Sequence, residues 1–305
     1  MELLMLAAGL GGLFLGGEAL VRGAIGAAQR LAISPLLIGL TVVGFGTSTP
    51  ELLVSVDAAL RGVPDISIGN IVGSNIGNIL LIVGVAALIW PIRVSGGTLR
   101  RDTAVMMAAA LALVPLFWLG EMGRSSGALL VLGLTGYLVW AYRQPGEGAT
   151  GDDTAEGMPA GRALLWIIGG LLALIVGARL LVDGAVTIAR DFGISEAFIG
   201  LTVVAIGTSL PELATSLVAA LRRQSEIAIG NIVGSNIFNV LGILGLTAII
   251  APIPVAPRFL AFDLPVMLTA SAGLTALLLL RPRIGRPVGA ALLVAYAAYV
   301  WAAQG

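Results

Sequence analysis

The sequence predicts an all-α integral membrane protein with ten transmembrane helices, built as two inverted repeats of five helices. Three observations predict this fold class: the composition, the number of long apolar segments and an internal duplication. The chain has 305 residues, of which 58% are hydrophobic and 11% are charged. Soluble domains carry about 25% charged residues. A soluble chain of this size could not bury so much apolar surface, so we expect lipid to surround it.

Ten segments are apolar and long enough to cross a bilayer, for which a helix needs about 20 residues. They lie at about 3–21, 32–60, 66–90, 103–120, 125–142, 163–182, 194–221, 227–251, 261–280 and 285–303. The first segment has no basic region before it, so we interpret it as a retained helix and not as a cleaved signal peptide. The second, third, seventh and eighth segments are interrupted by Gly, Pro and Ser, whereas the others are plain apolar helices.

The internal duplication has a constant offset of 161 residues. Residues 39–60 and 200–221 are identical at 15 of 22 positions, and residues 69–80 and 230–241 at 10 of 12. These stretches are also the most polar parts of otherwise apolar segments. Duplicated polar motifs inside membrane helices are typical of a transporter with one shared site near the bilayer centre.

The duplication divides the chain into a first five-helix repeat at 1–143, a linker at 144–161 and a second five-helix repeat at 162–305. We expect the two repeats to form one integrated transmembrane domain. Because five is an odd number, the second repeat must enter the membrane from the opposite side. This predicts an inverted repeat about a two-fold axis in the membrane plane, which brings equivalent polar residues together at the centre.

The arginines predict the orientation of the chain. All 17 basic residues are arginine, and 12 of them fall on one side of the ten-span arrangement, against five on the other. The positive-inside rule then places the linker in the cytoplasm and both termini outside. We expect a multi-pass protein of the inner cell membrane. The linker is Gly-rich and acidic, and we interpret it as a flexible tether, because its acidic residues do not have EF-hand spacing.

The motif GTSTPEL should break its helix near residues 46–49, because Pro50 has no N–H and its ring clashes with the preceding turn. Freed carbonyls at this depth need an internal partner, and a bound cation is one. Ser48, Glu51 and Ser55 then share one helix face. The second copy repeats the pattern with Thr208, Ser209 and Glu212.

Glu51 and Glu212 are the strongest candidates for a functional role. An ionisable side chain at the bilayer centre costs roughly 2.5–3.5 kcal/mol on insertion scales. The chain has no Lys, and no Arg lies near the midpoints of these segments. Protonation or a mobile cation must therefore neutralise the carboxylates. Asp57 has no acidic counterpart and lies four residues before Arg61, so we expect it to form a surface ion pair.

The second motif, GNIVGSNIGN, places Ser74 and Asn78 on one helix face, and Ser235 and Asn239 repeat this spacing. Such residues often only form hydrogen bonds between helices. Because each pair follows a duplicated glutamate, we interpret them as ion ligands. Asn75 and Asn236 point away from the face of Ser74 and Ser235, and we expect them to form hydrogen bonds between helices and not to bind ions.

The absence of Cys and His excludes several kinds of functional site. Without them there is no disulfide framework, no thiol nucleophile and no histidine metal ligand. Any bound cation must therefore be coordinated by oxygen atoms. No constellation of a hydrolase or protease is present, so we expect a transporter and not an enzyme. Symmetric polar motifs could also line a channel, but the Gly-rich core segments favour a closed, moving bundle.

The duplicated pattern GTS-x-PEL followed by GN-x-x-GSN-x-x-N resembles the α-repeats of the calcium/cation antiporter superfamily, and its prokaryotic sodium/calcium exchanger branch in particular. The resemblance covers nearly the whole chain. It implies a fold in which helices 2, 3, 7 and 8 enclose a central cation site while helices 1 and 6 slide across it.

The resemblance also implies a set of ligands for the transported ions. The acidic ligands fall on Glu51 and Glu212, and the backbone ligands on Gly44 and Ala205. The hydroxyl, carbonyl and amide ligands fall on Thr47, Ser48, Ser74, Asn78, Thr208, Ser209 and Ser235. Asn239 departs from the family, because many sodium/calcium exchangers carry Asp at that position. The predicted site therefore has two carboxylates and not three.

These observations predict a secondary antiporter that extrudes Ca²⁺ in exchange for Na⁺ by alternating access. The alternative is exchange of Ca²⁺ or another cation for protons through the same two glutamates. The expected partners are Na⁺, Ca²⁺ and membrane lipid, with no nucleic acid and no cofactor. A monomer is expected to be sufficient for transport.

Overall fold

The computed structural model describes residues 1–31, 33–93, 97–143, 158–192, 205–280 and 283–303. Within these ranges eight helices are long and apolar enough to cross a membrane, and a ninth span results when one bent helix pair is counted. The chain is therefore a multi-pass helical membrane protein, as predicted. The predicted linker and the first part of the predicted seventh span lie outside the described residues.

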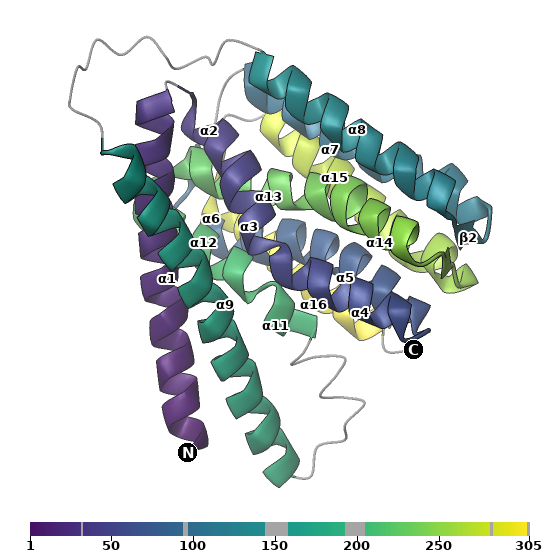
Figure 1. Ribbon diagram of the computed structural model, residues 1–305, viewed down its shortest axis with the longest axis horizontal. Coiled ribbons are helices and arrows are strands. Elements are labelled where there is room, and N and C mark those ends of the chain that lie inside the picture. Colours follow the sequence, from purple (N-terminus) through teal and green to yellow (C-terminus); the bar gives the residue numbers. More distant parts are fainter. Residues whose placement is uncertain (32, 94–96, 144–157, 193–204, 281–282, 304–305) are drawn as a thin grey trace.

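Helices α1 (Glu2–Leu31) and α9 (Ala160–Asp191) are both longer than the predicted spans 3–21 and 163–182. The predicted C-terminal ends of these two spans were therefore wrong. Arg22 does not end α1, because it bonds to Glu18 one turn earlier and stacks on Trp166 of α9. Figure 1 shows α1 and α9 side by side on one flank of the protein.

A line of small residues, which we call the glycine seam, holds α1 and α9 together. A Cβ atom on Gly9, Gly16 or Gly23 would lie 2.7–2.8 Å from a backbone nitrogen of α9. The partner nitrogens belong to Leu181, Leu174 and Ile167 in that order, so the two helices are antiparallel. Small residues allow this close approach of two membrane helices.

The second span is broken, as predicted. It consists of α2 (Pro35–Ile38), the π-helical turn η1 (Gly39–Val43), α3 (Gly44–Thr47) and α4 (Thr49–Leu60). The two parts meet at an angle of 42°. Ser48 lies at the break with φ −83° and ψ 8°, outside helical geometry, and Pro50 follows in the first turn of α4.

The second repeat has the same break in its described part. Helix α11 (Ala205–Thr208) ends at Ser209, which has φ −87° and ψ 6°, and α12 (Leu210–Leu221) follows. The duplicated motif therefore produces the same local backbone twice, because each copy has a proline two residues after the serine.

The segments predicted as the third and eighth spans are the most buried of the long helices that the structure describes. The third comprises α5 (Pro64–Gly77), η2 (Asn78–Ile82) and α6 (Val83–Ile89). The eighth comprises α13 (Ser225–Ile237), η4 (Phe238–Leu244) and α14 (Gly245–Ile250). The most apolar stretches of these spans are 78% and 89% buried, against 6–39% for the other six long helices among the described residues. Both spans continue through the polar motif and widen there into a π-helical turn, a feature that often marks functional sites.

The outer helices are α7 (Gly97–Trp118), α8 (Arg124–Arg143), η5 (Phe259–Asp263) with α15 (Leu264–Leu280), and α16 (Arg286–Ala303). Two short antiparallel sheets join the loops between helices. Strand β1 (Ile92–Arg93) pairs with β4 (Arg283–Ile284), and β2 (Glu121–Met122) pairs with β3 (Ile253–Pro254). Each sheet joins two loops that the predicted topology places on the same side of the membrane.

Candidate functional site

The two glutamates of the duplicated motif lie in the interior, and each contacts a serine of the other repeat. Glu51 and Glu212 are 0% and 1% exposed. Ser48 donates a hydrogen bond from Oγ to Glu212 Oε1 at 2.8 Å. Ser209 donates to Glu51 Oε1 at 3.2 Å. The helix break of each repeat therefore supports the glutamate of the other.

Two further serines join this arrangement from the central spans. Ser209 Oγ lies 3.2 Å from Ser74 Oγ on α5. Ser235 on α13 donates to the backbone carbonyl of Gly44 at 3.3 Å, close to the break at Ser48. Ser74 and Ser235 are 6% and 0% exposed. Ser74 of α5 and Ser235 of α13 thus contact the broken spans.

A cluster of four asparagines lies where α5 and α13 meet their π-helical turns. Asn78 donates from Nδ2 to Asn236 Oδ1 at 3.0 Å, and Asn239 donates to Asn75 Oδ1 at 3.0 Å. Asn75 Nδ2 also donates to the Asn236 carbonyl at 3.4 Å. Asn75 and Asn236 join the two helices, as expected. Their bonds also orient the amides of Asn78 and Asn239.

Four buried acceptor oxygens at this centre have no hydrogen-bond partner within the described part of the chain: Glu51 Oε2, Glu212 Oε2, Asn78 Oδ1 and Asn239 Oδ1. They form two equivalent pairs, one from each repeat. A buried carboxylate oxygen without a hydrogen-bond partner is costly, and a bound cation or a proton removes that cost. Carboxylate, amide and hydroxyl oxygens are the ligands of hard cations such as Ca²⁺.

The remaining predicted residues lie at the helix breaks. Thr47 Oγ1 is 3.0 Å from the Val43 carbonyl, and Thr208 Oγ1 is 3.3 Å from Asn70 Oδ1. Ala205 is the first residue of α11. Among the residues that the structure describes, no three acidic side chains come together. Within the described part of the chain, Glu51 and Glu212 are therefore not joined by a third acidic side chain.

Two residues with a clear place in this centre were missed in the sequence analysis. Asn70 on α5 and Asn231 on α13 each donate to the backbone carbonyl of the glutamate in their own repeat, at 3.1 Å and 3.3 Å. Each also accepts a bond from a threonine of the other repeat. The available signal was their identity in both copies of the motif, directly after the first glycine.

The sequence profile described as "Sodium/calcium exchanger protein" matches residues 1–143 and 162–304. The chain belongs to the sodium/calcium exchanger family. The resemblance drawn from the duplicated motifs is therefore confirmed, and the match leaves out only the linker and the last residue. Membership of this family makes the chain a membrane transport protein.

Two relatives and one solved structure illustrate the similarity. The chain is 40% identical over 275 residues to the inner membrane protein YrbG of Escherichia coli (strain K12), covering 86% of this chain and 84% of YrbG. It is 32% identical over 339 residues to the sodium/calcium exchanger MaX1 of Methanosarcina acetivorans, covering 97% of both chains. A solved structure of the sodium-calcium exchanger NCX_Mj, soaked with 2.5 mM Na⁺ and 0.1 mM Ca²⁺, superimposes with a TM-score of 0.86 at 33% identity. It covers 98% of this chain and 97% of NCX_Mj.

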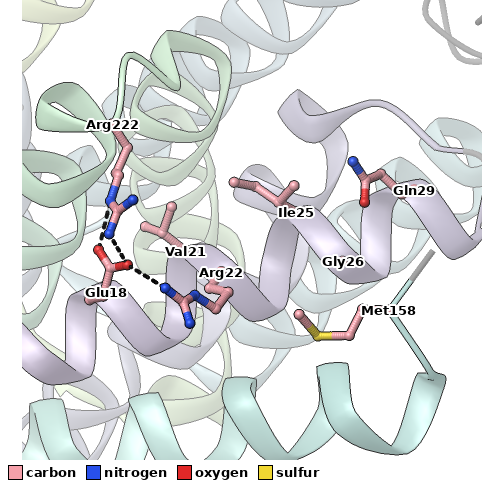
Figure 2. Close-up of a pocket in the computed structure, with 8 residues that line it drawn as sticks. All are labelled: Glu18, Val21, Arg22, Ile25, Gly26, Gln29, Met158 and Arg222. Atoms are coloured by element: carbon pink, nitrogen blue, oxygen red, sulfur yellow. Dashed lines mark hydrogen bonds and ion pairs between the residues drawn. The ribbon is translucent and has the colours of Figure 1, made fainter. Parts of the chain in front are cut away.

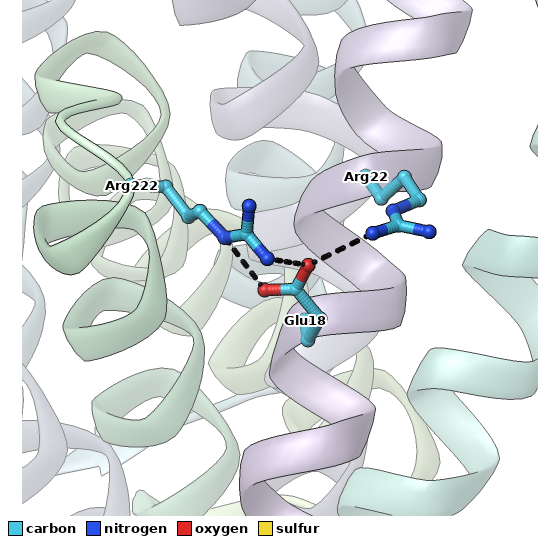
Figure 3. Close-up of polar contacts among 3 residues, drawn as sticks. All are labelled: Glu18, Arg22 and Arg222. Atoms are coloured by element: carbon cyan, nitrogen blue, oxygen red, sulfur yellow. Dashed lines mark hydrogen bonds and ion pairs between the residues drawn. The ribbon is translucent and has the colours of Figure 1, made fainter.

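Two acidic residues outside the centre of this exchanger-family protein, Asp57 and Glu18, form ion pairs with exposed arginines. Asp57 pairs with Arg61 at 2.8 Å, and both side chains are more than half exposed, as predicted. Glu18 lies between Arg22 and Arg222, which links α1 to the end of α12 (Figure 3).

A pocket of about 180 Å³ lies beside Glu18, with Gln29 and Met158 in its wall (Figure 2). None of its lining residues belongs to the duplicated motifs. The pocket is therefore separate from the buried centre.

Proposed function

We propose that the protein is a secondary antiporter that extrudes Ca²⁺ in exchange for Na⁺ by alternating access. The observation that supports this proposal best is the set of four buried acceptor oxygens without a partner, on Glu51, Glu212, Asn78 and Asn239. They come from both copies of the duplicated motif, and the two glutamates among these residues also make the crossed serine–glutamate contacts.

The ion ligands in this proposal are the twelve predicted residues. Two carboxylates from opposite repeats match the charge of one Ca²⁺. Hydroxyls, amide oxygens and the carbonyls freed at the helix breaks complete the 6–8 oxygen ligands that Ca²⁺ prefers. The set comprises Gly44, Thr47, Ser48, Glu51, Ser74, Asn78, Ala205, Thr208, Ser209, Glu212, Ser235 and Asn239.

The charge of the centre explains coupling in this proposal. With both glutamates ionised and no ion bound, the centre carries about −2, and carrying bare charge through hydrocarbon is costly. One Ca²⁺ makes it neutral, and Na⁺ ions make it neutral or slightly positive. Only the loaded protein then changes the side to which the centre opens, which makes an exchanger and not a leak.

The proposal includes the topology predicted from the sequence: two inverted five-helix repeats at 1–143 and 162–305, a cytoplasmic linker at 144–161 and both termini outside. It also includes a core of helices 2, 3, 7 and 8 and a location in the inner membrane. Support comes from the two short sheets, each of which joins loops expected on one side. The high burial of the third and eighth spans supports the core. A monomer contains both halves of the centre.

Proton coupling is the alternative. Asn239 leaves the centre with two carboxylates, and a proton on each of them would neutralise it as well as Ca²⁺ does. A protonated carboxyl can donate a hydrogen bond as well as accept one. The same residues would then exchange Ca²⁺ for protons.

The test is uptake of radioactive calcium by proteoliposomes loaded with Na⁺, compared with vesicles loaded with K⁺ or choline at a clamped pH. We expect uptake only from the Na⁺-loaded vesicles. Uptake that ignores Na⁺ and follows an imposed pH gradient would support proton coupling. No uptake under either gradient would contradict both forms of the proposal.

A further inference from the structure

Asn70 connects three parts of the centre. Its amide nitrogen donates to the Glu51 carbonyl at 3.1 Å and to Ser55 Oγ at 3.0 Å, both on α4. Its oxygen accepts from Thr208 Oγ1 at 3.3 Å, at the helix break of the second repeat. Both amide hydrogens are used, so the side chain has one defined orientation.

Asn231 makes the same three bonds in the other half. Its nitrogen donates to the Glu212 carbonyl at 3.3 Å and to Ser216 Oγ at 2.9 Å, both on α12. Its oxygen lies 3.1 Å from Thr47 Oγ1 at the helix break of the first repeat. Asn231 is 0% exposed. The repetition of all three bonds argues against a chance packing contact.

We propose that Asn70 and Asn231 are positioning residues for the ion site. Each holds the glutamate of its own repeat against the helix break of the opposite repeat, and in this way sets the spacing of the two carboxylates. The inference rests on the proposed exchange function, because it concerns the same site. Neither asparagine needs to touch the ion.

This positioning role predicts that the two transported ions respond differently when Asn70 or Asn231 is lost. One Ca²⁺ must contact both glutamates together, so its binding depends on their spacing. A Na⁺ ion is neutralised by a single carboxylate and depends on that spacing less. Loss of a group that orients a metal ligand typically lowers metal affinity by about 10-fold to 100-fold. The loss of Asn70 or Asn231 should therefore weaken the binding of Ca²⁺ more than that of Na⁺.

The experiment compares Asn70→Ala and Asn231→Ala with the wild-type protein in proteoliposomes, with KM for Ca²⁺ and KM for Na⁺ measured separately. We expect KM for Ca²⁺ to rise by about 10-fold to 100-fold, and KM for Na⁺ to rise less. A matched control is Ser67→Ala. Ser67 is also buried on α5, and its hydroxyl has no partner within the described residues. An unchanged KM for Ca²⁺ in both asparagine variants, or an equal change in Ser67→Ala, would overturn the proposal.

A second pair of variants tests the proposal even if the asparagine variants do not fold. Ser55→Ala and Ser216→Ala remove one acceptor of each asparagine and leave the asparagine in place. Each should raise KM for Ca²⁺ in the same direction by a smaller factor, and Ser55→Ala should add nothing to Asn70→Ala. Additive effects in the double variant would show that the two residues act separately, which contradicts the proposal. If Asn70→Ala does not fold, an unchanged KM in both serine variants overturns it.

Failure of the proposed function gives a different result. If the wild-type protein shows no Na⁺-driven calcium uptake, the proposed Na⁺/Ca²⁺ exchange is contradicted. The positioning role of Asn70 and Asn231 is then tested by a binding measurement. In that case the shift of the melting temperature by added Ca²⁺ is compared between the wild type and Asn70→Ala in detergent. Equal shifts would overturn the positioning role, and a smaller shift in the variant would support it.

Discussion

Ser48 of the first repeat donates a 2.8 Å hydrogen bond to Glu212 of the second, and both side chains are buried. The equivalent pair, Ser209 and Glu51, makes the same contact at 3.2 Å in the opposite direction. The two halves of the duplicated sequence therefore complete each other at the centre. Neither half holds its own glutamate through the serine at its own helix break.

Replacement of either glutamate should abolish transport. Glu51→Gln and Glu212→Gln keep the shape of the side chain, but each removes a charge and turns one acceptor oxygen into an amide donor. We expect calcium uptake to fall to the level of vesicles without protein. The control is Asp57→Asn, which removes an exposed ion pair with Arg61 and should leave uptake largely intact. Near-normal uptake by Glu212→Gln would contradict the proposed site.

A third carboxylate at position 239 should make transport depend more strongly on pH. Asn239→Asp adds a group that binds cations only when it is deprotonated, so Ca²⁺ uptake should fall more steeply in the variant as the pH is lowered. The substitution also removes the donor that bonds to Asn75 Oδ1. Calcium uptake is measured in both proteins across a pH series at constant Na⁺. Superimposable pH profiles would mean that position 239 is structural.

The glycine seam predicts a difference between two glycines of the same helix. In Gly16→Ala the new Cβ would lie 2.8 Å from Leu174 N and 2.9 Å from the Gly170 carbonyl, so the backbones must separate. Overpacking of this kind costs about 1–3 kcal/mol of folding free energy. Gly11→Ala is the control, because its Cβ would meet nothing within 4 Å. The melting temperature in detergent should fall for Gly16→Ala alone. Equal melting temperatures would contradict this packing.

The contact of Glu18 with Arg222 should contribute little to stability and nothing to ion affinity. The side chain of Arg222 is 54% exposed, and exposed ion pairs contribute about 0–1 kcal/mol. We expect Glu18→Gln to change the melting temperature only slightly and to leave KM for Ca²⁺ unchanged. Both are measured on the same preparation. A changed KM would show that this contact between α1 and α12 is coupled to the buried centre.

Much of the fold and part of the site could be predicted from the sequence. The composition indicated the membrane, and Pro50 and Pro211 predicted the two helix breaks, which the structure has at Ser48 and Ser209. Glu51 and Glu212 were candidates from the cost of burying an ionisable group. These inferences depend on local chemistry, which a linear sequence contains in full.

Other features depend on how separate segments pack against each other. The sequence pattern around Arg22 predicted the end of a span, but α1 continues to Leu31 because Arg22 has partners on α1 and α9. Helical spacing indicates which residues share a face of one helix. It does not indicate which residue of another helix lies opposite.

The sequence by itself thus determined the membrane class, the duplication and the identity of the two buried carboxylates. Only the tertiary structure decided that Ser48 contacts Glu212, and that Asn70 bonds to both Glu51 and Thr208. The physical reason is distance along the chain. Ser48 and Glu212 are separated by 164 residues, and their hydrogen bond exists only because both repeats pack around one centre.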